Sequence, residues 1–404
     1  MLKKDNFFKH HFIRSKEYKK NLRKTKKVFN AFLLDLRNNQ IPLLASYEKN
    51  YGLGFSKNIV RKFSKYKNII IIGMGGSILG TKSIYSFLGK KIKKKVFFFD
   101  NLDTNLNSNY KKIKNLKNSC FIVAGKSGKT IETIVNLGVV FSKNLLKNKL
   151  IIIAEPTDNA LMEIANKYHA EVIEHKEFIS GRYSVLSETG MFPAALMGLN
   201  LKKFKNLKGL IKNKNFSSIL IQNVASIYTF ILKKINNSVT LNYDSNLNDL
   251  GYWYQQLVAE SLGKKDKGIN PILSFGPKDH HSLLQLYLDG PKDKFFTFFN
   301  SLPKENKFKV PKNIIPDNMK FLKNKNLNFI INAQCDAVKN IFKLKEIPYR
   351  QITFNKKNEE ELGEIFTFFV LETILLSRLM NVNPYDQPAV EQVKTETKKF
   401  LRQV

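Results

Sequence analysis

The feature that most constrains the fold is a short apolar run that ends at a cluster of glycines. Ile69–Ile72 is four isoleucines in a row, and Gly73, Gly75 and Gly76 follow directly. β-Branched runs bounded by glycines are typical of buried parallel strands. Because Ile78–Leu88 then has helical spacing, the stretch predicts a strand, a glycine turn and a helix. A turn of this kind directs backbone N–H groups and the positive end of a helix dipole at an anion.

The glycine loop matches neither of two common nucleotide-binding motifs. The dinucleotide fingerprint requires a glycine where this chain has Ile78, and a Walker A loop would close with Gly-Lys-Ser or Gly-Lys-Thr. Ser77 can add a hydroxyl donor at the start of the helix. The loop therefore predicts phosphate binding, and the alternative is a tight strand–helix turn without a ligand.

A second strand–loop–helix unit carries a loop rich in small hydrogen-bond donors. Cys120–Ala124 predicts a strand, and a helix is expected to extend to Ser142. Hydroxyls, backbone amides and a lysine at a helix N-terminus suit a phosphate, whereas the alternative is an ordinary Ser/Thr helix cap. Two such loops in neighbouring units favour a phosphate. The loop residues are Gly125, Lys126, Ser127, Gly128, Lys129 and Thr130.

Strands and helices are expected to alternate along most of the chain, which predicts an α/β fold with parallel sheets. Ligands of such sheets bind at the carboxyl ends of the strands, where both glycine loops lie. The further predicted strands are Val96–Phe99, Leu150–Ala154, Ser238–Asn242, Pro271–Phe275, Phe295–Phe299, Leu327–Asn332 and Tyr349–Phe354. The further predicted helices include Leu247–Leu262, Ser282–Leu288, Glu359–Leu379 and a last helix that Pro388 opens.

The charge of the chain raises the question of nucleic-acid binding, because its formal net charge is +35. The lysines do not cluster, however, but stand beside asparagines in nearly every loop and exposed helix face. Dedicated nucleic-acid binding is therefore not expected, whereas a diffuse attraction for small anions is.

Two cysteines, Cys120 and Cys335, give neither a disulfide framework nor a metal cluster, and both are expected to be buried. The basic N-terminal stretch has no continuous apolar segment of the kind found in secretory signals. No run approaches the ~18 apolar residues of a membrane helix. A cytoplasmic protein that does not bind membranes is therefore expected.

Two further positions are candidates for site chemistry. Arg182 lies in the loop Ser180–Gly190 and is either an anion clamp or a solvated charge. Gln256 and Glu260 are four residues apart on a predicted helix, so their side chains share one face.

Taken together, six motifs resemble the glucose-6-phosphate isomerase (phosphoglucose isomerase) family, in the family's order and over roughly residues 45–400. The stretches that contain Glu260 and Lys394 are the most specific, because the glycine loops are shared by the wider sugar-isomerase (SIS) fold. The motifs are IGMGGSILG at Ile72–Gly80, GKSGKTIET at Gly125–Thr133, GRYS at Gly181–Ser184, QQLVAESLGK at Gln255–Lys264, DHHSLLQ at Asp279–Gln285 and NPYDQPAVEQVK at Asn383–Lys394.

The resemblance implies two SIS-type domains, each a parallel sheet flanked by helices. We expect a helical N-terminal segment at residues 1–50, the two SIS-type domains at 51–205 and 206–380, and a C-terminal helical segment that carries Lys394 at 381–404. It also implies reversible isomerisation of glucose 6-phosphate and fructose 6-phosphate, as in glycolysis and gluconeogenesis, without a metal or organic cofactor. Members of the family are usually homodimers in which a histidine reaches the neighbouring site.

The resemblance also assigns roles to single residues. Gly76, Ser77 and the loop Gly125–Thr130 are similar to the family's phosphate-binding positions, and Gln256 to a substrate-binding glutamine. The catalytic positions are assigned as Glu260 for the base between C1 and C2, Arg182 beside the enediolate, His281 for ring opening and Lys394 at the ring oxygen.

The chemistry asks for the same residue types independently of the resemblance. Abstraction of a proton next to a carbonyl needs a carboxylate, and Glu260 supplies one. The enediolate needs a fixed cation, which Arg182 provides because arginine stays charged. Ring opening needs an acid that titrates near neutral pH, which suits histidine. Since His280 and His281 are adjacent, their side chains diverge and at most one is expected to be catalytic. The resemblance selects His281, through the family's spacing to Ser282 and Gln285.

Three positions depart from the family pattern. Gly125 stands where the family commonly has a serine, Lys129 replaces a usual threonine, and Ser180 replaces a glycine. The alternatives that remain are a non-catalytic phosphosugar-binding SIS module and an isomerase with additional activity on mannose 6-phosphate. A regulator would keep the glycine loops but would not need Glu260, His281 and Lys394 together.

Overall fold

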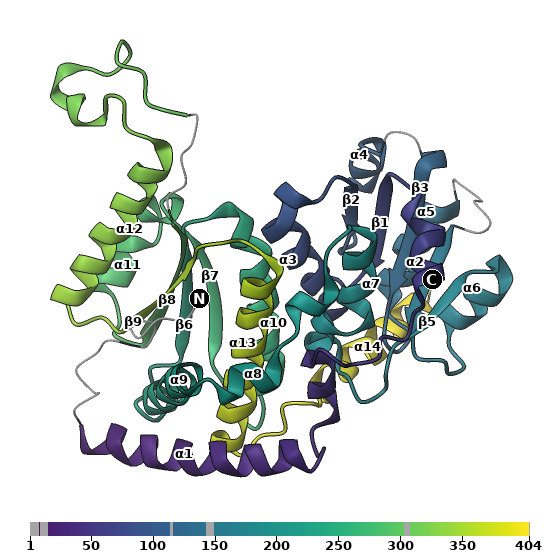
Figure 1. The fold of residues 1–404 in the computed structure, drawn as a ribbon, viewed down its shortest axis with the longest axis horizontal. Coiled ribbons are helices and arrows are strands. Elements are labelled where there is room, and N and C mark those ends of the chain that lie inside the picture. The colour runs from purple at the N-terminus through teal and green to yellow at the C-terminus, as the bar shows by residue number, and fades with distance from the viewer. Residues whose placement is uncertain (1–7, 9–14, 114–115, 143–148, 303–307, 404) are drawn as a thin grey trace.

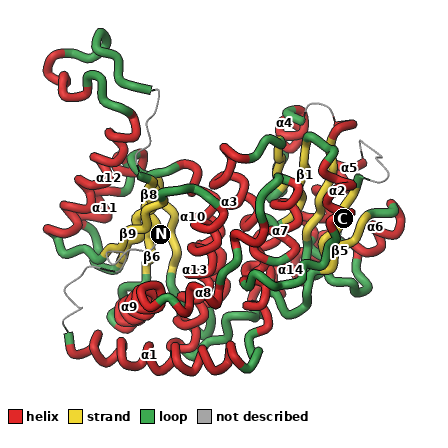
Figure 2. The backbone as a smooth tube through the Cα atoms, in the orientation of Figure 1, coloured by secondary structure: helices red, strands yellow, loops and turns green. Residues whose placement is uncertain are grey.

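The computed structural model describes residue 8 and residues 15–113, 116–142, 149–302 and 308–403. These residues form two parallel β-sheets, each flanked by helices, as Figures 1 and 2 show. The α/β architecture expected from the sequence is therefore confirmed.

The first sheet has the strand order β2-β1-β3-β4-β5, with every pair of neighbours parallel. The central strands are buried along their whole length, which explains why their sequences are apolar runs without alternation. Gly73 at the end of β1 is paired with Ala124 at the end of β3, so the two glycine loops begin side by side. The strands are β1 (Asn68–Gly73), β2 (Lys95–Phe99), β3 (Ser119–Ala124), β4 (Leu150–Ala154) and β5 (Glu171–Glu174).

The second sheet has the order β7-β6-β8-β9 and is also fully parallel. In both sheets the chain leaves an inner strand (β1 or β6) to form the neighbour on one side and then crosses to the other side. Each sheet therefore has a switch point, where ligands of α/β proteins bind. The strands are β6 (Asn237–Asn242), β7 (Asn270–Phe275), β8 (Lys294–Ser301) and β9 (Tyr349–Phe354).

One predicted strand is wrong. Leu327–Asn332 is the first part of helix α12 (Leu327–Leu344), and the Asn326 side chain caps that helix by accepting from the Asn328 N–H. The short apolar run resembles a strand when it is considered alone. Cys335, Val338 and Phe342, however, continue it at helical spacing and form the buried face of α12.

The remaining helices cover the two sheets. Helix α1 (Lys16–Arg37) packs on α9 and α13, as Figure 1 shows, and its Phe29 and Phe32 are buried. Both cysteines are buried as expected. The other helices are α2 (Lys57–Ser64), α3 (Leu79–Leu88), α4 (Leu106–Lys111), α5 (Ile131–Ser142), α6 (Ala160–Tyr168), α7 (Glu188–Leu196), α8 (Leu207–Lys212), α9 (Lys214–Leu232), α10 (Asn248–Leu262), α11 (Leu284–Asp289), α13 (Glu359–Met380) and α14 (Ala389–Leu401).

Helix α9 is the one described helix that is long and apolar enough to cross a membrane. More than half of its apolar window, 56%, is buried inside the fold. It packs against α1, α8 and α13, which accounts for its composition as that of a core helix.

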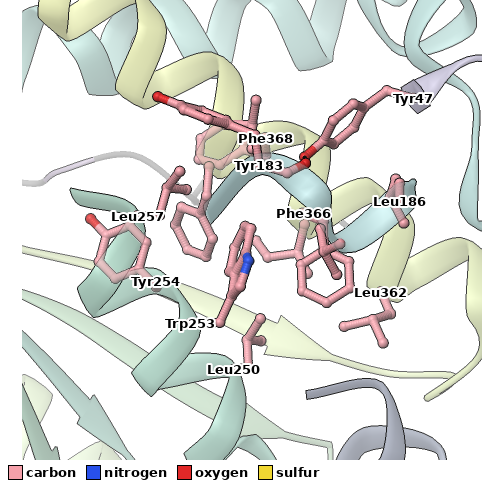
Figure 3. Close-up of a cluster of buried hydrophobic side chains, with 14 of the residues drawn as sticks. Tyr47, Tyr183, Leu186, Leu250, Trp253, Tyr254, Leu257, Leu362, Phe366 and Phe368 are labelled. Carbon is pink, nitrogen blue, oxygen red and sulfur yellow. The ribbon is translucent and has the colours of Figure 1, made fainter. Parts of the chain in front are cut away.

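The core between the two sheets fixes helix α10, which carries the predicted glutamine and glutamate. Figure 3 shows Trp253, Tyr254 and Leu257 of α10 packed among aromatic and aliphatic side chains. The rings of Trp253 and Phe366 of α13 are 4.7 Å apart, centroid to centroid. Since this face of α10 is buried, Gln256 and Glu260 lie on a different, less buried face.

Lys205 is an unusual element of the core, because its side chain is buried and its amine has no hydrogen-bond partner. The ammonium lies 4.7 Å from the centroid of the Tyr51 ring. Burial lowers the pKa of Lys205 to about 8, and the nearby Glu188 carboxylate offsets part of that effect. A buried cation without a hydrogen-bonded partner lowers the stability of the fold.

We predict that Lys205→Met raises the free energy of unfolding at pH 7 by about 1–2 kcal/mol. Glu188 keeps its hydrogen bonds from Tyr51 and Gly54. Between pH 8 and 10.5 the unfolded chain binds more protons than the folded one, so the wild type gains stability as pH rises and the difference shrinks. Urea unfolding at pH 7 and pH 10 measures this, with the exposed Lys202→Met as control. Equal stability of wild type and Lys205→Met at pH 7 would contradict the prediction.

Candidate active site

The loop after β1 is held tightly against the elements that carry the other candidate residues. Its short 3₁₀ helix, Gly75–Ser77, packs on the 3₁₀ helix Gly181–Leu186. A Cβ atom on Gly76 would lie 2.4 Å from the backbone nitrogen of Arg182, and one on Gly75 would lie 2.6 Å from Nε2 of Gln256. Only glycine allows this approach, and Gly75 also has a positive φ of 51°. The structure therefore brings Gly76, Arg182 and Gln256 together.

Arg182 is buried, and all five N–H donors of its guanidinium are used. This network ties the arginine to α10 and to the C-terminal segment, so its position is fixed before any ligand binds. The acceptors are Ser261 Oγ at 2.9 Å, Glu260 Oε2 at 3.3 Å, Gln387 Oε1 at 2.6 Å, the Pro384 carbonyl at 2.5 Å and the Asp386 carbonyl at 2.9 Å.

Glu260 lies between a cation and an amide. Its Oε2 faces Arg182, and its Oε1 accepts from Gln256 Nε2 at 2.9 Å. The expectation that Gln256 and Glu260 share a helix face is therefore confirmed. The Glu260 side chain remains 30% exposed, so a small molecule can reach the carboxylate. The Gln256 carbonyl oxygen is buried without a hydrogen-bond partner, and a hydroxyl of a ligand would satisfy it.

The site also contains residues that the sequence analysis did not single out. Gln387 and Ser261 accept from Arg182, and Lys264 donates to the Glu260 and Ser261 carbonyls at 2.8 and 3.0 Å. Burial lowers the pKa of Lys264, and the charge of Arg182 adds to this. All three lie inside the two most specific motifs, so a search for polar positions within these motifs could have found them.

The second loop leaves β3 beside the first loop, as expected. Gly128 has a positive φ of 64°. The Lys126 ammonium donates to the Glu177 carbonyl at 2.7 Å and lies 3.5 Å from a Glu155 carboxylate oxygen. Ser127 and Lys129 are exposed, so their side chains are accessible to an anion at this edge of the sheet.

His281 is not brought into this cluster by its own chain. It is exposed and follows β7, an edge strand of the second sheet. The neighbouring His280 is engaged elsewhere, since its Nε2 lies 2.6 Å from the Tyr243 hydroxyl. Burial lowers the pKa of His280 below its usual value.

Lys394 also lies apart from the cluster within the described chain. It is exposed on α14, which begins after Pro388 as predicted, and its ammonium is 2.6 Å from Glu391. Among the described residues, no group of three or more His, Cys, Asp or Glu side chains could hold a metal ion.

Comparison with known proteins decides the family. A sequence model described as phosphoglucose isomerase matches residues 57–275, which is more than half of the 404-residue chain. The chain belongs to the phosphoglucose isomerase family. The glucose-6-phosphate isomerase of Methanocaldococcus jannaschii is 31% identical over 353 residues, covering 85% of this chain and 86% of that protein. That of Campylobacter jejuni is 31% identical over 352 residues, covering 83% and 85%.

Solved structures support the same fold for this phosphoglucose isomerase family member. A hypothetical protein from Thermus thermophilus gives a TM-score of 0.79 at 20% identity, with 98% of this chain and 100% of that chain covered. A glucose-6-phosphate isomerase from Chlamydia trachomatis gives 0.70 at 17% identity, with 85% and 71% covered. The two-sheet architecture implied by the resemblance is thus shared with these proteins.

Proposed function

We propose that this protein interconverts glucose 6-phosphate and fructose 6-phosphate by moving a proton between C1 and C2. One observation carries the proposal: the Glu260 carboxylate is held between an arginine and an amide, beside the glycine loop, in a chain of the phosphoglucose isomerase family. Relatives at 31% identity over most of the chain carry the name glucose-6-phosphate isomerase.

The proposed reaction starts from the open-chain aldose. Glu260 removes the proton from C2, the electron pair of that bond forms the C1–C2 double bond, and the carbonyl oxygen O1 takes the negative charge. Arg182 stabilises this enediolate because its guanidinium is fixed and charged. A proton moves from O2 to O1, Glu260 returns its proton to C1, and fructose 6-phosphate results. This scheme uses side chains alone.

The phosphate is assigned to the two glycine loops. Gly76 and Ser77 offer donors at the start of α3, and the loop Gly125–Thr130 offers the lysine and hydroxyl donors of the neighbouring strand. Gly125 lacks the hydroxyl that a serine supplies at this position in the family, and the positive charge of Lys129 in the same loop compensates for it. The Gln256 carbonyl oxygen, which is buried without a hydrogen-bond partner, accepts a hydrogen bond from a sugar hydroxyl.

A coupled assay tests the proposal. Purified protein is added to fructose 6-phosphate, and glucose 6-phosphate formation is followed with its dehydrogenase. Turnover is expected. A well-folded protein without turnover that still binds fructose 6-phosphate would favour the non-catalytic SIS module. A parallel assay with mannose 6-phosphate measures whether the C2 epimer is also accepted.

Replacement of Arg182 distinguishes stabilisation of the enediolate from binding of the substrate. We predict that Arg182→Ala lowers kcat about 10²–10³-fold and changes KM less, because the cation acts mainly on the charge of the enediolate. Arg182→Lys should not restore kcat, since one ammonium cannot replace five hydrogen bonds to acceptors on two segments. Steady-state kinetics measure both, with the exposed Arg61→Ala as control and thermal unfolding as a check of the fold. A raised KM with unchanged kcat would make Arg182 a binding residue only.

We infer further that the active form is a cytoplasmic homodimer in which His281 reaches the neighbouring site. This inference is supported by the family and by the exposure of His281, which makes no hydrogen bond or ion pair with the substrate-site residues in the described part of its own chain. Lys394 is assigned to the ring oxygen, by its place in the motif Asn383–Lys394.

Complementation distinguishes the two arrangements. Glu260→Gln and His281→Ala homodimers are each expected to be nearly inactive. Co-refolding them at equal amounts should restore about a quarter of the wild-type activity, because half of the dimers are mixed and each mixed dimer has one intact site. No recovery, in a mixture that light scattering shows to be dimeric, would place His281 in its own chain's site.

A further inference from the structure

A large cavity beside the second sheet lies outside the isomerase site. It has a volume of about 780 Å³, within the range of small-molecule sites. Its wall is made where β6, β8 and β9 end, at Asp244, Ser301 and Lys357, together with the last turn of α3 and the first turns of α12. This is the switch point of the second sheet, the position that corresponds to the two glycine loops in the first sheet.

The polar side of the cavity is fixed by hydrogen bonds within the protein. The Asp244 carboxylate accepts from Ser301 Oγ and Lys357 Nζ, each at 2.5 Å, and from the Asn246 N–H at 3.0 Å. Deeper along β8, Asn300 Oδ1 accepts from Thr353 Oγ1 at 2.9 Å. These bonds use the acceptor oxygens of Asp244 and Asn300, but Ser301 Oγ gives its proton to Asp244 and keeps lone pairs that can accept from the hydroxyls of a polyol.

The charge of the lining is positive. Lys90, Lys91, Lys356 and Lys357 line the cavity, and Asp244 is the one carboxylate among the lining residues that the structure describes. Lys357 neutralises Asp244, and Lys91 is paired with Glu359 at 2.6 Å. Lys90 and Lys356 make no ion pair with any residue that the structure describes, so their charges are available to an anion.

The part of the lining that α12 contributes is partly apolar. Leu327 and Ile331 of α12 belong to it, and Leu327 is 45% exposed. A lining that combines apolar surface with fixed polar groups suits a carbon skeleton that carries hydroxyls.

We propose that this cavity is a second binding site, for a phosphorylated polyol, in addition to the isomerase site. Lys90 and Lys356 bind the phosphate, Ser301 Oγ accepts from a hydroxyl, and the α12 wall contacts the carbon chain. Helix α10 separates the two sites: Asn248 at its start follows the cavity residues and Glu260 is near its end, about 18 Å away at 1.5 Å per residue. The cavity variants therefore leave the isomerase residues untouched.

Calorimetric titration with glycerol 3-phosphate tests the proposal, because this phosphorylated polyol has no carbonyl and cannot be isomerised. The wild type should bind two molecules per chain. Lys90→Glu combined with Lys356→Glu should weaken one of them more than about tenfold, with isomerase kcat and KM unchanged. Lys126→Ala combined with Ser127→Ala should weaken the other. Lys20→Glu combined with Lys27→Glu on α1 makes the same change in net charge and should keep both sites.

Three results would overturn the second site. One is a wild type that binds a single molecule, lost in the Lys126/Ser127 variant. Another is a Lys90/Lys356 variant that binds like the wild type. The third is inorganic phosphate binding to the cavity as tightly as glycerol 3-phosphate, which would remove the polyol from the assignment. The isomerase assay is independent of all three, so failure of the second site does not affect the proposed reaction.

Discussion

Glu260→Gln is expected to lower the turnover of fructose 6-phosphate by at least about 10²–10⁴-fold while leaving the fold intact. The substitution removes the group that takes and returns the proton, yet it keeps the size and the hydrogen-bonding capacity of the side chain. The fold is retained because Glu260 is 30% exposed and Arg182 keeps its hydrogen bonds to Ser261, to Gln387 and to two backbone carbonyls. Steady-state kinetics and thermal unfolding of the variant measure both expectations.

The control for this substitution is Glu163→Gln, a change of the same kind on the exposed face of α6. It should leave both turnover and stability unchanged. Arg182 and Gln256 would remain in place in the Glu260 variant, so its KM for fructose 6-phosphate should change little. Normal turnover by Glu260→Gln would remove this residue from the role of base.

Glu372→Gln is expected to lower the free energy of unfolding by about 3–5 kcal/mol. Glu372 and Arg350 form a bidentate ion pair, with Nη2 to Oε1 at 2.9 Å, and both side chains are almost completely buried. Arg350 also contacts the rings of Phe8 and Phe369, and its Nε donates to Thr297 at 3.0 Å. Without the carboxylate, a buried guanidinium is left with no opposite charge.

Two comparisons separate this effect from a general loss of charge. Glu396→Gln breaks the exposed Lys399–Glu396 pair and should cost less than about 1 kcal/mol. Replacing the buried pair by Arg350→Met and Glu372→Leu together should restore much of the stability lost in Glu372→Gln, since no unpaired charge remains. Denaturant unfolding measures all three variants. A loss below about 1 kcal/mol for Glu372→Gln would show that the pair does not contribute as described.

Much of the fold could be predicted because its signals are local. The central strands β1, β3 and β4 are buried on both faces, so each is an apolar run that the sequence shows directly. Strand β5 was missed because it is a short edge strand in which Glu171 and Glu174 interrupt the apolar pattern. The prediction of a strand at Leu327–Asn332 was wrong because the apolar signal there is too short. Six apolar and amide residues do not distinguish a strand from the start of a helix.

The candidate site could be predicted only where a motif fixes the positions along one element. Gln256 and Glu260 are neighbours because helix geometry makes them so, and their contact is confirmed. The contacts of Arg182 with Gln387 and with the Pro384 carbonyl join segments about 200 residues apart, and no spacing rule predicts such contacts. The roles of His281 and Lys394 stay predictions, because they depend on how a partner chain or α14 is placed.

The most direct test of the site itself is a crystal structure of Glu260→Gln with fructose 6-phosphate bound. We expect the phosphate at Gly76–Ser77 and the loop Gly125–Thr130, with C1 and C2 next to residue 260 and within reach of Arg182. A sugar phosphate found with full occupancy elsewhere, and none between these two loops and α10, would contradict the proposed active site.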